Sequence, residues 1–244
     1  MMSTNSSKII EDYKMDSNKR TARLAGLLYL IWVLTGLYGV FYIPSQTIVP
    51  GDAAATANKI LANEFLFRTG IVNDIISNAL WVLIALVLYR LFKQVNERQA
   101  KLLVTLVIVQ IPAVIFMEAF NITSLMVLKG EVLKTLGISQ RQDLAMLFFK
   151  INEYGSFVLK TFWGLWLLPF GYLVYKSGFI PRVFGIFLIL NGIAYIIPSF
   201  TTLLFPNYAN IVSQFALPFW VLGEISIMLW LLIKGVRTQQ PEAA

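Results

Sequence analysis

Residues 211–234, IVSQFALPFWVLGEISIMLWLLIK, are long and apolar enough for a helix to cross a lipid bilayer. The hydrocarbon core of a bilayer is about 30 Å thick, which takes about 20 residues of helix to span. Backbone polar groups inside lipid must be hydrogen-bonded within the segment, so such a stretch forms a helix. One ionisable residue, Glu224, interrupts the apolar run, and an ionisable residue inside a membrane span is a candidate functional site.

Five other stretches of the chain are long and apolar enough to cross a membrane in the same way. The chain of 244 residues is 57% hydrophobic and 14% charged, whereas a soluble domain has about 25% charged residues. Polar side chains are too few to cover the apolar surface, so lipid must solvate it. We predict an all-α, polytopic integral membrane bundle of six transmembrane helices, formed by residues 22–43, 68–92, 101–128, 145–176, 182–204 and 211–234.

The charged residues between the spans predict the orientation of the chain. Basic residues gather before the first span, in the loops near 90–101 and 176–182, and after the last span, while the opposite loops hold fewer. Because loops rich in lysine and arginine stay inside the cell, we expect both termini to be cytoplasmic. The predicted transmembrane domain covers residues 21–236, between a disordered cytoplasmic N-terminal tail at 1–20 and a cytoplasmic C-terminal tail at 237–244.

Two residue types are missing from the chain, and its charge balance is basic. The chain has no cysteine and no histidine, which removes thiol nucleophiles, disulfides and the ligands of most zinc, haem and iron–sulfur sites. We therefore expect no cofactor and no bound metal. The formal net charge is +7. Because most of the cations lie next to spans, we predict anionic membrane lipids as their partners rather than nucleic acid.

Five polar residues from five different spans are predicted to lie at one depth in the membrane. A helix rises about 1.5 Å per residue, so the distance of a residue from the end of its span gives its depth. All five fall within about 5 Å of the midplane of the hydrocarbon core: Asn78, Glu118, Lys160, Asn191 and Glu224. Three further polar residues lie nearer the outer face and predict a polar cavity that opens outward: Asp74, Asn121 and Glu153.

Three interpretations of this polar layer stay open. A buried ion pair between Lys160 and Glu118 or Glu224 would neutralise two charges and hold helices together. The single lysine can pair with only one of the two carboxylates. The other carboxylate, unpaired and titratable, resembles the proton or cation sites of transporters. Ser156 and Lys160 are four residues apart on one helix, where a lysine can act as the general base for a serine. No oxyanion-hole motif accompanies them.

These interpretations correspond to three functions. The first is a membrane protein that binds or translocates a small solute, a lipid or a cation, with Glu118, Glu224 and Lys160 carrying the charge. The alternative is a non-enzymatic structural or regulatory subunit, in which the polar layer only joins helices. The third is an intramembrane hydrolase. The serine–lysine spacing is common by chance, so the sequence favours a protein that is not an enzyme.

Local patterns predict where helices begin and bend. Pro50-Gly51-Asp52 is a helix-start signal in which Asp52 caps the helix. Ser139 followed by Gln142 fits a capping box, and the helix that starts there is predicted to run into the fourth span without a break. Four prolines inside the spans each free a backbone carbonyl and permit a kink: Pro112, Pro169, Pro198 and Pro218.

Several segments resemble one family of bacterial membrane proteins. The most specific is GYLVYKSGFIPR at 171–182, which also predicts a tight turn between two spans. It is supported by LYRLFK at 88–93, by Pro50-Gly51-Asp52 with Arg68 after it, and by Gly223-Glu224 with LWLL at 229–232. Over about residues 20–236 the chain is similar to the family known as a domain of unknown function, DUF4386. The resemblance implies a six-span protein of a prokaryotic inner membrane and carries no established activity.

Overall fold

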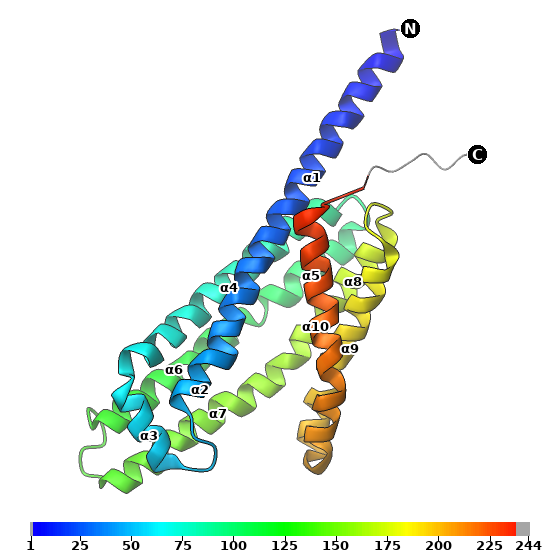
Figure 1. Ribbon diagram of the computed structural model, residues 1–244. Coiled ribbons are helices and arrows are strands. Elements are labelled where there is room, and N and C mark those ends of the chain that lie inside the picture. Colours follow the sequence, from blue (N-terminus) through cyan, green and yellow to red (C-terminus); the bar gives the residue numbers. More distant parts are fainter. Residues whose placement is uncertain (1, 238–244) are drawn as a thin grey trace. The chain divides into compact units, whose positions relative to one another are not determined.

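The computed structural model describes residues 2–237, which contain helices and no β-strand. Figure 1 shows the helices with their labels. In chain order the elements are α1 (Met2–Gly36), η1 (Leu37–Tyr42), α2 (Ile43–Thr47), α3 (Ala53–Ala62), α4 (Glu64–Phe92), α5 (Glu97–Ile108), α6 (Ile111–Lys129), α7 (Ile138–Leu165), α8 (Leu167–Lys176), α9 (Arg182–Leu204), η2 (Pro206–Tyr208) and α10 (Ala209–Ile233). The segment η1 is a π-helix, and η2 is a short 3-10 helix.

Six helical stretches of the described chain are long and apolar enough to cross a membrane. They are Asp16–Thr47, Glu64–Phe92, Glu97–Lys129, Ile138–Lys176, Arg182–Leu204 and Pro206–Ile233. No more than half of the most apolar part of each stretch is buried inside the protein. Large apolar side chains such as Leu34, Phe116 and Phe215 are therefore exposed on the helix surfaces. The six predicted helices are confirmed, and their length and composition are those of a multi-pass membrane protein.

The chain divides into two compact units. Unit 1 consists of Met1–Leu30, Trp81–Ile108 and Lys160–Ala244, and unit 2 consists of Ile31–Leu80 and Val109–Leu159. The change from unit 1 to unit 2 after Ile108 coincides with the break between α5 and α6. Each unit has its own packed interior and its own group of buried polar side chains.

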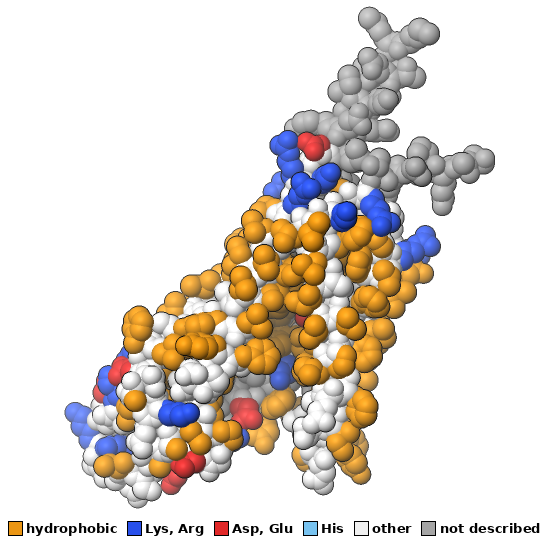
Figure 2. Space-filling model, viewed as in Figure 1, with side chains coloured by type: hydrophobic (Ala, Val, Ile, Leu, Met, Phe, Trp, Pro, Cys, Tyr) orange, Lys and Arg blue, Asp and Glu red, His pale blue; other side chains and the backbone are white. Residues whose placement is uncertain are grey.

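Glycine contacts bring the helices of unit 1 close together. Helix α9 packs against both α8 and α10, as Figure 1 shows. An ideal Cβ atom on Gly164 of α7 would lie 2.4 Å from the carbonyl oxygen of Gly192 on α9, and one on Gly171 of α8 would lie 2.7 Å from that of Gly185. Small residues allow this close approach of helices in membranes. Figure 2 shows apolar side chains along these helices and basic side chains where α10 ends.

The segment that is most specific to the family resemblance forms a tight turn in unit 1. Gly178 has a φ angle of 71°, in the left-handed region that suits glycine. The carbonyl of Phe179 accepts a hydrogen bond of 2.9 Å from the backbone N–H of Arg237. The Phe179 ring stacks on Phe92 at a centroid distance of 5.7 Å. The turn thus holds the chain that follows α10 and gives the motif a structural role.

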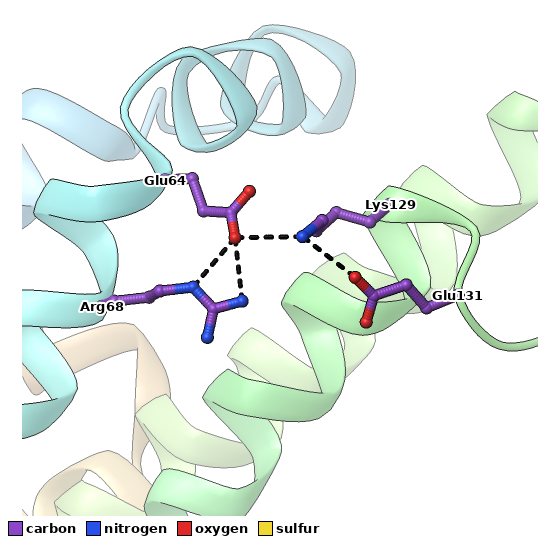
Figure 3. A network of polar contacts seen from close by, with 4 residues as sticks. All are labelled: Glu64, Arg68, Lys129 and Glu131. Atoms are coloured by element: carbon purple, nitrogen blue, oxygen red, sulfur yellow. Dashed lines mark hydrogen bonds and ion pairs between the residues drawn. The ribbon is translucent and has the colours of Figure 1, made fainter.

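Unit 2 has an apolar core and a charged network at its surface. Helix α3 packs on α6, and the core joins Ala57, Ile60, Phe67, Ile71, Leu125, Val127, Leu128 and Ala145. In the network, drawn in Figure 3, Glu64 contacts Arg68 at 2.8 Å and Lys129 at 3.1 Å. Lys129 also contacts Glu131 at 2.9 Å. The network joins the start of α4 to the end of α6.

The start of α7 differs from the predicted capping box. The helix begins one residue after Gly137, and the Gln140 side-chain oxygen accepts a hydrogen bond of 2.9 Å from the Gly137 backbone N–H. The predicted roles of Ser139 and Gln142 are therefore wrong, because both residues already lie inside the helix. The helix starts earlier because a glutamine three residues after a glycine N-cap reaches back to it in the same way. As predicted, the helix runs on into the fourth span without a break, to the end of α7.

Two of the four predicted proline kinks are breaks in the helices. A proline has no N–H, so it leaves the carbonyl four residues earlier without its helical partner. Pro112 follows the break between α5 and α6, and Pro169 lies three residues after the break at Trp166, between α7 and α8. Pro198 and Pro218 lie inside α9 and α10, which continue through them.

The N-terminal helix differs from the disordered tail predicted at 1–20. Helix α1 includes most of that segment, so it extends the first span into polar sequence. Arg20 and Asp16, four residues apart, form an exposed ion pair of 3.0 Å, and pairs at this spacing favour helix over a disordered chain. Of the C-terminal tail predicted at 237–244, all residues except Arg237 lie outside the described residues.

Helix α3 begins where the sequence predicts, and its cap can be tested. Asp52 Oδ1 accepts a hydrogen bond of 2.8 Å from the backbone N–H of Ala55. Replacing Asp52 by alanine removes this acceptor, so we expect the free energy of unfolding to fall by about 1 kcal/mol. Thermal unfolding of the purified protein in detergent measures the loss. Asp52→Asn keeps an oxygen at the same place and should lose little; equal losses in both variants would contradict the capping role.

Candidate functional site

Unit 2 contains a cavity of about 440 Å³. Binding sites for small molecules occupy about 300 to 1,000 Å³, so this volume suits a small solute. Apolar side chains, including Phe67, Met146 and Phe149, form one part of the cavity wall. The polar side chains on the wall are Thr47, Thr56, Asp74, Asn121, Lys150, Asn152 and Glu153.

The carboxyl groups of Asp74 and Glu118 form the centre of the polar side of this site. Asp74, on α4, lines the cavity, and Glu118, on α6, is buried. The two groups are close enough to hydrogen-bond to each other. Asn73 Nδ2 donates to Asp74 Oδ1 at 3.2 Å, and Asn121 Nδ2 donates to Glu118 Oε2 at 2.9 Å. A hydrogen bond between two carboxyl groups needs a proton on one of them, so the pair can hold one proton between its members.

The π-helix η1 leaves room for the Asp74 side chain. An ideal Cβ atom on Gly39, which belongs to η1, would lie 2.8 Å from Asp74 Oδ1 and 2.7 Å from Asn73 Nδ2. A larger residue at this position would therefore push both groups away. Pro44 follows the segment and leaves the carbonyl of Val40 without its α-helical donor, which favours the wider turn. Turns of this kind occur often at functional sites.

A second charged pair lies on the cavity wall. Lys150 Nζ is 2.7 Å from Glu153 Oε2, three residues away on α7, and both side chains are more than half exposed. These two charges offset each other. The negative charge that remains on the wall belongs to Asp74 and, through the hydrogen bond, to Glu118. The other hydrogen-bond partners of these two carboxyl groups are neutral amides.

Unit 1 holds a different polar cluster, centred on Glu224 of α10. The hydroxyl of Tyr29, on α1, donates to Glu224 Oε1 at 2.6 Å. Asn191 Nδ2 and the Tyr195 hydroxyl, both on α9, donate to Glu224 Oε2 at 3.5 Å and 3.4 Å. Tyr29 and Asn191 are fully buried, and Glu224 is 7% exposed. Both carboxylate oxygens therefore have donors, and the cluster joins three helices.

Close packing surrounds this cluster. An ideal Cβ atom on Gly223 would lie 2.5 Å from the Asn191 Cβ atom, so the glycine lets α9 approach α10 next to Glu224. The Tyr195 ring stacks on Trp220 with their centroids 5.2 Å apart. Asn191 Oδ1 is buried without a hydrogen-bond partner among the described residues. Such contacts are typical of helix packing around a buried polar group in a membrane.

The structure brings four of the predicted site residues to the cavity region of unit 2. Asp74 and Glu153 line the cavity, together with Asn121, which was predicted to share it. Glu118 contacts Asp74 from α6, and Asn78 Nδ2 donates to the Asp74 backbone carbonyl at 2.8 Å. The cavity thus has the three polar residues that the sequence assigns to the outer half of the spans.

The remaining predicted residues belong to unit 1. Asn191 and Glu224 meet there, and Lys160 lies half-buried on α7 in the same unit. One layer at a single depth, and an ion pair of Lys160 with a glutamate, stay predictions. The hydroxyl of Ser156, proposed as a nucleophile, donates to the carbonyl of Asn152 one turn earlier at 2.9 Å.

Three partners of the buried carboxyl groups were not predicted from the sequence: Tyr29, Asn73 and Tyr195. A tyrosine ring fits into an apolar run, and its hydroxyl needs a hydrogen-bond partner only when it is buried. Hydropathy alone therefore does not distinguish a tyrosine that binds a carboxyl group from one that only packs. Tyr195 follows Asn191 by four residues, and residues at this spacing share a helix face. That spacing is the signal that could have found Tyr195, whereas Tyr29 has no comparable neighbour.

Comparison with known proteins agrees with the motifs. A protein-family model described as "Domain of unknown function (DUF4386)" matches residues 24–235. An uncharacterized protein of Archaeoglobus fulgidus is 31% identical over 93 residues, which are 38% of this chain and 51% of that protein. The chain therefore spans about half the length of that relative. No solved structure matches the chain. Because the family model covers most of the chain, including both polar clusters, the chain belongs to the family Domain of unknown function (DUF4386).

Proposed function

We propose that the protein binds a small solute in the cavity of unit 2, as a step in moving that solute across the membrane. The observation that supports this proposal is the cavity of about 440 Å³ with Asp74 and Asn121 on its wall and Glu118 behind them. A charged residue inside a membrane span costs about 3 kcal/mol on insertion scales. If Asp74 and Glu118 served only to join helices, we would expect their carboxyl groups to face cationic side chains. Their amide partners instead favour a binding site in which a solute supplies the remaining partner of the carboxyl groups.

We further propose that the protein lies in a bacterial inner membrane with both termini in the cytoplasm. Arg23 Nη2, near the start of the first span, donates to the carbonyl of Ile233 at the end of α10 at 3.4 Å. The beginning and end of the spanning region therefore lie at the same end of unit 1. Basic side chains gather there (Figure 2), and basic loops stay on the cytoplasmic side. Anionic lipid headgroups are the partners that this chemistry fits.

A structural role is the second candidate, and the Glu224 cluster favours it. Tyr29, Asn191 and Tyr195 satisfy both oxygens of Glu224 from two neighbouring helices. A carboxylate that is satisfied in this way joins helices without any ligand. The two proposals therefore concern different units, and variants in unit 1 and unit 2 separate them.

The solute-binding proposal predicts that one face of α7 is open to small molecules. The natural chain has no cysteine, so a single introduced cysteine reports on its own surroundings. We expect Met146→Cys, on the cavity wall, to react with a charged thiol reagent in the purified protein. Ala145→Cys, next to it but 1% exposed in the core of unit 2, should react at least about 100-fold more slowly because opening a buried site costs free energy.

Four matched aromatic solutes then test binding: 2-phenylethylamine, its N,N,N-trimethyl derivative, 2-phenylethanol and 3-phenylpropionate. We expect at least one of them to protect Met146→Cys from the reagent. Equal reaction rates for the two cysteines, or protection by none of the four solutes, would contradict the proposed function. The thermal stability of each cysteine variant shows that it is folded.

A further inference from the structure

We propose that the solute is a hydrophobic organic cation, and that it displaces a proton held between Asp74 and Glu118. This inference rests on the proposed function, because it names the class of solute that the same cavity takes. Three features of the cavity lead to it: the charge on its wall, the aromatic side chains beside that charge, and the hydrogen bond between the two carboxyl groups.

The charges around the cavity favour a cation. Helix α4 contributes Asp74, and α7 contributes Lys150 and Glu153, which form an ion pair with each other. Glu118 on α6 faces Asp74. The wall residues from η1, α2, the loop after α2 and α3 have no ionisable side chain: Gly39, Ile43, Pro44, Thr47, Ile48, Val49, Pro50, Gly51 and Thr56. A cationic solute therefore meets an excess of negative charge, whereas an anion would meet repulsion.

The apolar part of the wall favours an organic cation over a metal ion. Phe67 and Phe149 meet edge to face, with centroids 5.9 Å apart, and both line the cavity with Met146. Aromatic faces attract ammonium groups, and a thioether adapts to apolar groups of varied shape. Among the residues that the structure describes, no cluster of three or more acidic side chains is placed to hold a metal ion. The wall therefore suits a molecule with an apolar body and one cationic group.

The proton balance follows from the carboxyl pair. In this proposal, the pair without solute holds one proton and carries one negative charge. An ammonium group that binds the Asp74 carboxylate takes the place of this proton, which leaves for the solvent. The pair then carries two negative charges, one of them offset by the bound cation. Because binding releases a proton, the affinity for the cation should rise with pH by about tenfold per pH unit wherever the free pair is protonated.

Protection of Met146→Cys by the four aromatic solutes tests this inference between about pH 6 and about pH 8, where an alkylammonium group stays charged. We expect 2-phenylethylamine and its trimethyl derivative to protect, and to protect at lower concentration as the pH rises. The trimethyl derivative cannot titrate, so its pH dependence belongs to the protein. A weakly buffered titration of the purified protein should release about one proton per bound cation.

Two variants assign the effect to its residues. Asp74→Asn should raise the concentration of either cation that is needed for protection by at least about tenfold, a change of about 1.4 kcal/mol. Glu118→Gln leaves the Asp74 carboxylate in place but cannot share a proton between two acids, so cation binding should persist and lose its pH dependence. Thermal unfolding of both variants shows whether they are folded.

The outcomes separate this inference from the proposed function. Protection by 2-phenylethanol or 3-phenylpropionate that equals protection by the cations would overturn the cation class and leave solute binding intact. If the protein with both Asp74 and Glu118 unchanged bound the cations with an affinity that does not depend on pH, proton displacement would be overturned. If none of the four solutes protects, both the inference and the proposed function fail.

Discussion

Replacing Glu224 by alanine is expected to lower the free energy of unfolding by about 3 kcal/mol. The Glu224 carboxylate accepts hydrogen bonds from Tyr29, Asn191 and Tyr195 inside unit 1. Its removal takes this acceptor away from the buried Tyr29 and Asn191 and the half-buried Tyr195, and each lost hydrogen bond costs about 1 kcal/mol. The shorter side chain also leaves a space among packed rings. Thermal unfolding of the purified protein in detergent measures the loss.

Two matched variants show that the loss comes from the cluster. Glu224→Gln keeps an oxygen that can accept from Tyr29, so it should lose about half as much as alanine. Glu131→Ala removes a carboxylate that is 45% exposed, from a surface ion pair with Lys129, and should change stability by less than about 1 kcal/mol. If Glu224→Ala were as stable as Glu131→Ala, the structural role of Glu224 would be wrong. A stable Glu224→Ala protein that no longer functions would instead assign the activity to unit 1.

The spans were predictable because lipid imposes a simple rule on sequence. A run of about 20 apolar residues must be helical to satisfy its backbone, and each of the six predicted runs is helical in the structure. Breaks in the helices are harder to predict, because a proline in the sequence does not always produce one. Pro169 accompanies a break at Trp166, whereas Pro218 lies in a continuous α10. The carbonyl that a proline leaves free finds other partners that depend on tertiary packing, which the sequence does not show.

The sequence groups some of the residues of the candidate site, but it does not predict their partners. The helical rise assigns Asp74, Asn121 and Glu153 to the outer half of their spans, where the sequence predicts a polar cavity, and in the structure the three residues line one cavity. The contact of Asp74 with Glu118 depends on which helices are neighbours, and depth along a helix does not determine that. The charge count predicts Lys160 as the partner of a carboxylate. That ion pair stays a prediction, whereas the amides and tyrosine hydroxyls that donate to the carboxyl groups in the structure are neutral and therefore do not enter a charge count.

Gly164→Ala is expected to destabilise the protein by about 2 kcal/mol, although alanine is the better helix former. The added Cβ atom would lie 2.4 Å from the carbonyl oxygen of Gly192 and 2.7 Å from the Ile196 side chain. A backbone carbonyl cannot rotate away, so α9 must move, and overpacking of this kind costs about 1–3 kcal/mol. Thermal unfolding in detergent checks the change, with retention of the folded protein after heating as a second measurement.

Gly36→Ala is the matched control, and it should change stability in the opposite direction. Gly36 has helical backbone angles, φ −62° and ψ −44°, and a Cβ atom there would meet nothing within 4 Å. Alanine at such a position restricts the unfolded chain and should stabilise the protein by about 0.5 kcal/mol. If both alanine substitutions changed stability equally, α7 and α9 would not be in close contact at Gly164.

Gly192 is next to Asn191 on α9, so a shift of that helix would also move Asn191 away from Glu224. The double variant Gly164→Ala, Glu224→Ala should therefore lose less free energy of unfolding than the sum of the losses in the two single variants.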